Sequence, residues 1–99
     1  MELLREKNKV VMKLDDKKIG EITWIEDNNN LVVDHTFVDP AHRGKDYARQ
    51  LVDAVVDIAR KENRMIIPVC PYVVKVFDRH EKYHDIYLKD EKYPSSCKI

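Results

Sequence analysis

A short basic turn between two apolar segments is the part of this sequence whose residue types could do chemistry. An apolar run ends at Val38, Pro40 interrupts it, and the tripeptide Arg43-Gly44-Lys45 leads directly into a helical pattern. Such a turn leaves backbone N–H groups free, and the start of a helix adds a partial positive charge. Arginine and lysine add full charges beside it. The segment therefore predicts a site for a phosphate or diphosphate group.

Cys70 is a second candidate, because it follows an apolar segment and precedes Pro71, a residue suited to the first turn of a helix. A helix N-terminus favours the thiolate, so Cys70 could be a nucleophile or could line a pocket. The alternative is a small buried apolar residue. His35 and His42 are candidate general bases, and Tyr72 and Tyr83 are candidate general acids; the sequence does not rank them.

The run His80-Glu81-Lys82-Tyr83-His84 matches the H-E-x-x-H pattern of zinc proteases. A catalytic zinc ion needs a third protein ligand and a substrate cleft, and little sequence follows His84 to provide them. We therefore predict no metal site. The alternative is a polar, solvated helix end.

The elements that must position these residues follow from hydrophobic periodicity. Polar turns separate three β-rich segments, which predicts an antiparallel meander of strands at 10–14, 19–26 and 31–38. A helix over 47–62 has one apolar face, formed by Ala48, Leu51, Val52, Val55, Ile58 and Ala59. A buried strand at 65–70 is expected to be parallel, reached by a right-handed crossover. A second helix begins at Pro71, with Val73, Val74, Phe77 and His80 on its inner side. The predicted fold class is α/β (α+β).

The basic turn resembles the acetyl-CoA pyrophosphate loop of the GNAT N-acetyltransferases, Arg/Gln-x-x-Gly-x-Gly/Ala. Arg43 matches the first position and Ala48 the last, while Asp46 stands where the family has its central glycine. A carboxylate repels a diphosphate, so the departure implies weaker cofactor binding. The segments Cys70-Pro71-Tyr72-Val73 and Phe77-Asp78-Arg79-His80, with Tyr83, resemble a very short subfamily, the YjdJ type. The resemblance covers roughly residues 9–88.

The resemblance implies a minimal GNAT-like fold that binds acetyl-CoA and transfers its acetyl group to an amine. It implies that a backbone N–H of Phe37 or Val38 holds the pantetheine arm and polarises the thioester, and that Arg79 and His80 support the active-site end. The implied catalytic residues are Cys70, His80 and Tyr83. The implied cofactor contacts are Phe37, Val38, His42, Arg43, Gly44, Lys45, Asp46, Tyr47, Ala48, Cys70, Tyr72 and Phe77.

Three functions are compatible with these residues: an N-acetyltransferase, a non-catalytic acetyl-CoA-binding or sensing module, and an interaction domain that has lost the cofactor. The amine acceptor is unknown and includes peptide or protein amines, because the family's final hairpin has no counterpart here. A partner subunit could complete the site, and we expect a monomer or weak dimer.

Composition limits other functions. The 99 residues predict one domain, and 18 basic against 18 acidic side chains argue against nucleic-acid binding. No apolar run is long enough to span a membrane, and the N-terminus lacks a secretory signal, so we expect a cytoplasmic protein. We expect residues 89–99 to be a mobile tail, and Cys70 and Cys97 to remain thiols.

Overall fold

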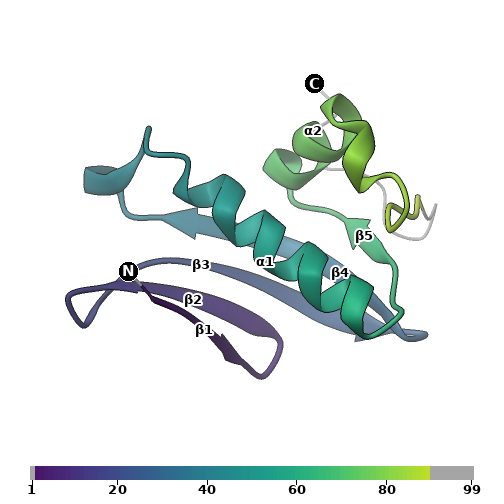
Figure 1. Cartoon of the computed structure of the whole chain (residues 1–99), viewed down its shortest axis with the longest axis horizontal. Coiled ribbons are helices and arrows are strands. Elements are labelled where there is room, and N and C mark those ends of the chain that lie inside the picture. The colour runs from purple at the N-terminus through teal and green to yellow at the C-terminus, as the bar shows by residue number, and fades with distance from the viewer. Residues whose placement is uncertain (1, 90–99) are drawn as a thin grey trace.

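A single mixed sheet of five strands is the framework of the molecule. The computed structural model describes residues 2–89. Its strands lie side by side in chain order, the first four antiparallel and the last parallel to its neighbour: β1 (Glu2–Glu6), β2 (Lys9–Leu14), β3 (Lys17–Asp27), β4 (Asn30–Val38) and β5 (Ile66–Pro68). The helix α1 (Tyr47–Lys61) connects β4 to β5, and α2 (Pro71–Arg79) follows β5 (Figure 1). The predicted α+β class and crossover are therefore confirmed.

The three predicted strands are present as β2, β3 and β4, and β1 is a further strand that had not been expected. β1 pairs with β2 along its whole length, and all five of its residues are exposed. The sequence Glu-Leu-Leu-Arg-Glu has no polar–apolar alternation, so a period of two does not reveal it. A left-handed backbone at Asn8, with φ of 62°, allows the chain to reverse between β1 and β2.

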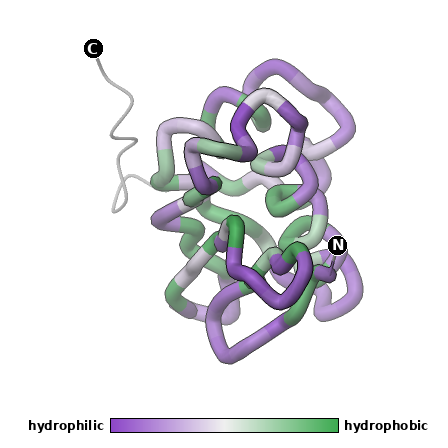
Figure 2. The backbone as a smooth tube through the Cα atoms, turned by 90° about the vertical axis from the view of Figure 1, so that its left-hand side faces the viewer, coloured by the Kyte–Doolittle hydropathy of each residue, from purple (hydrophilic) through white to green (hydrophobic). Residues whose placement is uncertain are grey.

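The core lies between the sheet and α1, which crosses β3 and β4 (Figure 1). The predicted apolar face of α1 is largely confirmed: Leu51, Val52, Val55 and Ala59 are buried, and Ala48 and Ile58 are partly buried. Val56 is also buried, so the apolar face is wider than predicted. Hydrophobic stretches of the chain gather inside the molecule, and hydrophilic stretches form its outer turns (Figure 2).

The second helix begins at Pro71 as predicted, with Cys70 as its N-cap residue. Its buried residues are Val73, Val76 and Phe77, whereas Val74 is only half-buried. β5 spans only Ile66–Pro68, because the following residues turn away from β4 towards α2. The short 3-10 helix η2 (Glu81–Tyr83) follows α2. The chain then returns to the outer edge of β5, where Tyr87 bridges to Ile66.

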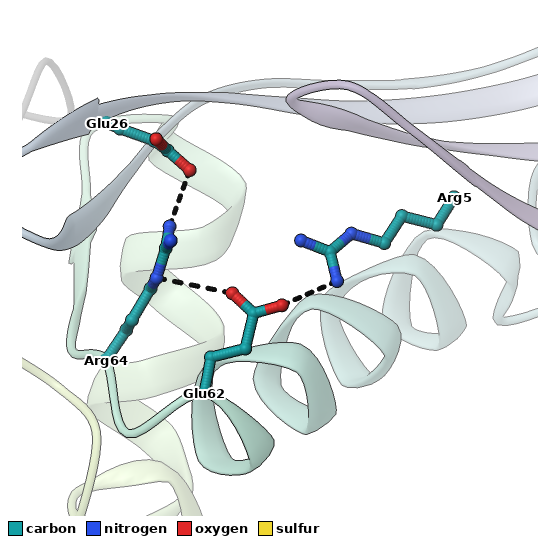
Figure 3. A network of polar contacts seen from close by, with 4 residues as sticks. All are labelled: Arg5, Glu26, Glu62 and Arg64. Atoms are coloured by element: carbon teal, nitrogen blue, oxygen red, sulfur yellow. Dashed lines mark hydrogen bonds and ion pairs between the residues drawn. The ribbon is translucent and has the colours of Figure 1, made fainter.

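Four charged side chains tie the end of α1 to the sheet (Figure 3). Glu62, at the end of α1, accepts from Arg5 of β1 at 2.6 Å and lies 3.2 Å from Arg64. Arg64 also contacts Glu26 of β3 at 2.5 Å. These pairs are partly exposed to solvent, so each adds little to the stability of the fold. Their role is to fix where the edge strand β1 lies against α1.

Between residues 2 and 89, no helix is both long and apolar enough to cross a membrane. The predicted mobile tail lies outside the described residues except for Lys89, and so does Cys97.

Candidate functional site

The strands β4 and β5 part halfway along β4, and this parting defines the candidate site. β5 pairs with β4 only as far as Val33. There Val33 O accepts hydrogen bonds from the backbone N–H groups of Val69, at 2.9 Å, and Cys70, at 3.1 Å. β4 continues to Val38, paired with β3. In Figure 1, β5 diverges from β4 towards α2. One edge of the second half of β4 is therefore left without a strand beside it among residues 2–89.

A β-bulge sits where the strands part. Thr23 pairs with His35 while Trp24 pairs with Val33, which leaves Asp34 as the extra residue of β4. Thr23 Oγ1 donates a hydrogen bond to Asp34 Oδ1 at 2.7 Å and holds the bulged residue to β3. A bulge bends its strand and increases the local twist. The bulge thus accounts for the change in direction of β4 immediately after its last pair with β5.

The backbone of β4 beyond the bulge offers alternate groups to the open edge. Asp39 N donates to Ile19 O at 2.7 Å, so the ladder places the polar groups of Phe37 towards β3. Because the backbone N–H and C=O groups of successive residues in a strand point to opposite sides, the groups of Thr36 and Val38 face the open edge. The carbonyl of Val38 there accepts a hydrogen bond from Arg43 Nε at 3.2 Å. The sequence analysis left Phe37 and Val38 as alternatives for the residue whose backbone N–H would hold the pantetheine arm. The strand geometry favours Val38, because its backbone groups face the open edge.

The basic turn lies at the same end of β4. The 3-10 helix η1 (Pro40–His42) is capped by Asp39, whose side chain accepts from Ala41 N at 2.9 Å. Gly44 has φ of 85° and Asp46 has φ of 64°, so both adopt the left-handed conformation that favours glycine. Asp46 is the N-cap residue of α1 but makes no capping hydrogen bond with its side chain. The first N–H groups of α1 are therefore left to water or to an anion.

Cys70 lies across the gap from β4. Its side chain is 7% exposed, and its Sγ lies 3.6 Å from Thr36 Oγ1 on the unpaired half of β4. The thiol is thus placed at the start of α2 and beside the open edge. Both the nucleophile and the pocket-lining interpretations are compatible with this position, since the thiol is nearly buried but borders the gap.

Tyr83 and His80 belong to a polar cluster with two side chains of α1. The Tyr83 hydroxyl donates to Asp53 and accepts from Arg49 Nε at 2.7 Å, while Arg49 Nη1 lies 3.4 Å from His80 Nε2. Tyr83 is 1% exposed, and burial together with the hydrogen bond to Asp53 raises its pKa. The phenol is therefore held as a structural contact. Neither Arg49 nor Asp53 was among the residues predicted for the site.

Two predicted cofactor contacts occupy different environments. Tyr72 is 37% exposed in the first turn of α2, and burial of its hydroxyl followed by the charge of Asp46 raises its pKa. Phe77 is fully buried and stacks on Tyr83 at 5.1 Å between ring centres. Phe77 thus supports α2 from the core. His42 is half-buried, with its ring 6.2 Å from that of Tyr47.

The two histidines of the H-E-x-x-H pattern do not share a helix. α2 ends at Arg79, His80 is its C-cap residue, and His84 follows η2. His80 Nε2 faces Arg49, and His84 Nε2 lies 3.0 Å from Phe77 O. Within residues 2–89, no group of three or more His, Cys, Asp or Glu side chains is arranged to hold a metal ion.

Comparison with known proteins identifies the family. The model of the GCN5-related N-acetyl-transferase family matches residues 9–86. The chain therefore belongs to the GCN5-related N-acetyltransferases, a class of acyltransferases, and the predicted superfamily is confirmed. The narrower assignment to the YjdJ type stays a prediction. Among curated proteins, none matches the sequence.

Solved structures agree with this assignment. A GCN5-like protein from Staphylococcus aureus is 32% identical with a TM-score of 0.74, over 91% of this chain and 90% of that one. Ribosomal-protein-alanine N-acetyltransferase from Brucella melitensis biovar Abortus 2308 is 23% identical with a TM-score of 0.56, over 92% and 67%. N-acetylglutamate synthase from Neisseria gonorrhoeae, complexed with coenzyme A and N-acetyl-glutamate, is 13% identical with a TM-score of 0.63, over 73% and 18%. The last two likenesses show the fold alone.

Proposed function

We propose that this protein binds acetyl-CoA in the gap between β4 and α2 and transfers the acetyl group to an amine. The observation that carries the proposal is the parting of β4 from β5 at Val33, with the uncapped start of α1 at the far end of the opened strand. The residues present fit the donor. The open edge offers amide-binding backbone groups, and the basic turn offers N–H groups and cations suited to a diphosphate.

The diphosphate is assigned to Gly44 and the first N–H groups of α1, with Arg43 and Lys45 beside them. Arg43 now rests on the carbonyl of Val38. An amide group of the pantetheine arm could take that carbonyl, which would release the guanidinium towards the phosphates. The thioester end then falls near the bulge, the last point before the strands close.

The reaction is a direct transfer. The amine nitrogen, freed of one proton by a base, attacks the thioester carbonyl carbon to form a tetrahedral oxyanion. A backbone N–H on the open edge of β4 stabilises that charge. The C–S bond then breaks, and the thiolate of CoA takes a proton from an acid. The products are an acetylated amine and free CoA.

Position ranks the candidate acids and bases. His35 lies on β4 beside the bulge, whereas His42 lies in η1 near the basic turn, so His35 is the better candidate for the base. Tyr72 is the better candidate for the acid, because the hydroxyl of Tyr83 is already donated to Asp53. Burial and then the charge of Asp46 raise the pKa of Tyr72.

The proposal is tested in two stages. Acetyl-CoA is titrated into the protein and into Arg43→Ala by calorimetry; we expect binding, weakened at least tenfold by the loss of about one charge-assisted contact. Release of free CoA thiol is then followed with a panel of peptide and polyamine amines. No binding at millimolar acetyl-CoA would refute the proposal. Binding without amine-dependent thiol release would refute transfer and favour a sensing module.

A further inference from the structure

A second arginine, Arg49, lies beside the start of α1 on the side that faces the segment after α2. Its Nε donates to the Tyr83 hydroxyl at 2.7 Å, and its Nη1 lies 3.4 Å from His80 Nε2. Its guanidinium carbon sits 5.4 Å from the centre of the Tyr83 ring. The guanidinium therefore has a fixed place, held by two residues from a different part of the chain.

Arg49 keeps its positive charge at this place. It is the third residue of α1, where a cation opposes the helix dipole. The hydrogen bond with Tyr83 raises the pKa of Arg49, and the charges of Asp53 and Asp46 raise it further. The guanidinium is therefore held as a cation in the first turn of α1.

The guanidinium retains donors for a ligand. An arginine has five N–H groups, of which one on Nε is used here and one on Nη1 points towards His80. Within the described chain, no hydrogen bond engages Arg49 Nη2. Arg49 is half-buried and lies in the first turn of α1, next to the uncapped helix start.

Arg43 and Arg49 are thus anchored separately, one on the Val38 carbonyl at the strand end and the other on Tyr83. Coenzyme A carries two separate anionic groups, the diphosphate and the ribose 3′-phosphate. We propose that Arg49, positioned by Tyr83, binds the ribose 3′-phosphate and makes this protein select CoA over dephospho-CoA. This inference rests on the proposed function. Tyr83 is a positioning residue here, since it acts through Arg49.

The test compares the dissociation constants of CoA and dephospho-CoA by calorimetry. For the unaltered protein we expect CoA to bind about tenfold more tightly, the scale of one charge-assisted hydrogen bond. Arg49→Gln should weaken the binding of CoA and leave that of dephospho-CoA unchanged. The ratio of the two dissociation constants should therefore fall to about one. Tyr83→Phe keeps the ring that stacks on Phe77 and should reduce the ratio in part, because Arg49 loses its anchor.

Arg60→Gln is the matched control. Arg60 also lies on α1 and also contacts the segment after α2, through Asp85 at 2.9 Å and Lys82 O at 2.6 Å. It is eleven residues from Arg49, about 16 Å along the helix. The Arg60→Gln variant should be less stable to heat, and its ratio of dissociation constants for dephospho-CoA and CoA should equal that of the unaltered protein.

The outcomes separate this inference from the function on which it rests. If neither ligand binds, the proposed function fails. If both bind equally to the unaltered protein, selection by the 3′-phosphate is refuted while cofactor binding stands. If the ratio is unchanged in Arg49→Gln, or falls equally in Arg60→Gln, Arg49 has no specific role in it.

Discussion

Asp46 offers the sharpest perturbation of the candidate phosphate site. It combines two features: a carboxylate at the start of α1, where an anion is expected to bind, and a left-handed backbone with φ of 64°. Asp46→Asn removes the charge and keeps a residue that tolerates this backbone. Asp46→Gly removes the charge and the Cβ together. Comparing the two separates electrostatic repulsion from steric hindrance.

The expected size follows from Coulomb's law. A carboxylate about 6 Å from an anion in water costs roughly 0.7 kcal/mol for each unit of ligand charge, hence about 1.4 kcal/mol for a diphosphate. Removing it should tighten CoA binding about tenfold at low ionic strength. At 0.15 M salt, screening over a Debye length of about 8 Å reduces the gain to roughly threefold. If the Cβ also hinders the ligand, Asp46→Gly should gain further affinity over Asp46→Asn.

The assay is calorimetric titration of CoA at low and at physiological salt, with thermal unfolding as a check on the fold. Glycine relieves a strained backbone but loses more entropy on folding, and the two effects, each about 1 kcal/mol or less, should leave the melting temperature nearly unchanged. Asp57→Asn, an exposed change eleven residues along α1, is the control and should leave affinity unchanged. Unchanged or weaker binding by Asp46→Asn at low salt would refute the repulsion argument.

Three further predictions concern other parts of the structure. Gly20→Ala would place a Cβ 2.9 Å from Phe37 O, so it should destabilise the fold by about 1–3 kcal/mol and weaken CoA binding; a neutral effect in both assays would contradict the close packing of the strand end. Cys70→Ala should abolish any acetyl label trapped on the protein from labelled acetyl-CoA. If it does so yet leaves amine turnover unchanged, direct transfer is supported over a Cys70 intermediate. Burial and then the hydrogen bond to Asp78 raise the pKa of Tyr87 to about 12, so this contribution to stability is complete below about pH 10 and lost as pH rises towards 12; Tyr87→Phe should flatten that part of the unfolding free-energy profile.

The regular elements could be predicted because their signals are local. The apolar positions of α1 recur at helical spacing, and the observed helix Tyr47–Lys61 differs from the prediction by one residue. Pro71 predicts the start of a helix, and α2 begins at that residue. β1 has no such signal, because an exposed edge strand is fixed by pairing with β2 and by the ion pair from Arg5 to Glu62.

The candidate site was predictable only in its loop. The basic side chains of Arg43 and Lys45 beside Gly44 predict an anion site without any knowledge of the fold. The cluster of Arg49, Asp53, Tyr83 and His80 joins residues about thirty positions apart in the sequence. No periodicity records such a contact, and Tyr83 looks the same in sequence whether it is an exposed acid or a buried anchor.

The bulge at Asp34 links the fold of the sheet to the candidate site. β5 ends at Pro68 and α2 begins at Pro71, so no strand of the described chain lies beside Thr36 and Val38. The bulge bends β4 at the point where β5 ends, and the polar groups of Thr36 and Val38 remain available beyond it. The proposed donor site thus depends mainly on backbone geometry, which many side chains can satisfy. This explains how a chain can carry Asp46 in place of the central glycine and still keep the left-handed turn that the loop requires.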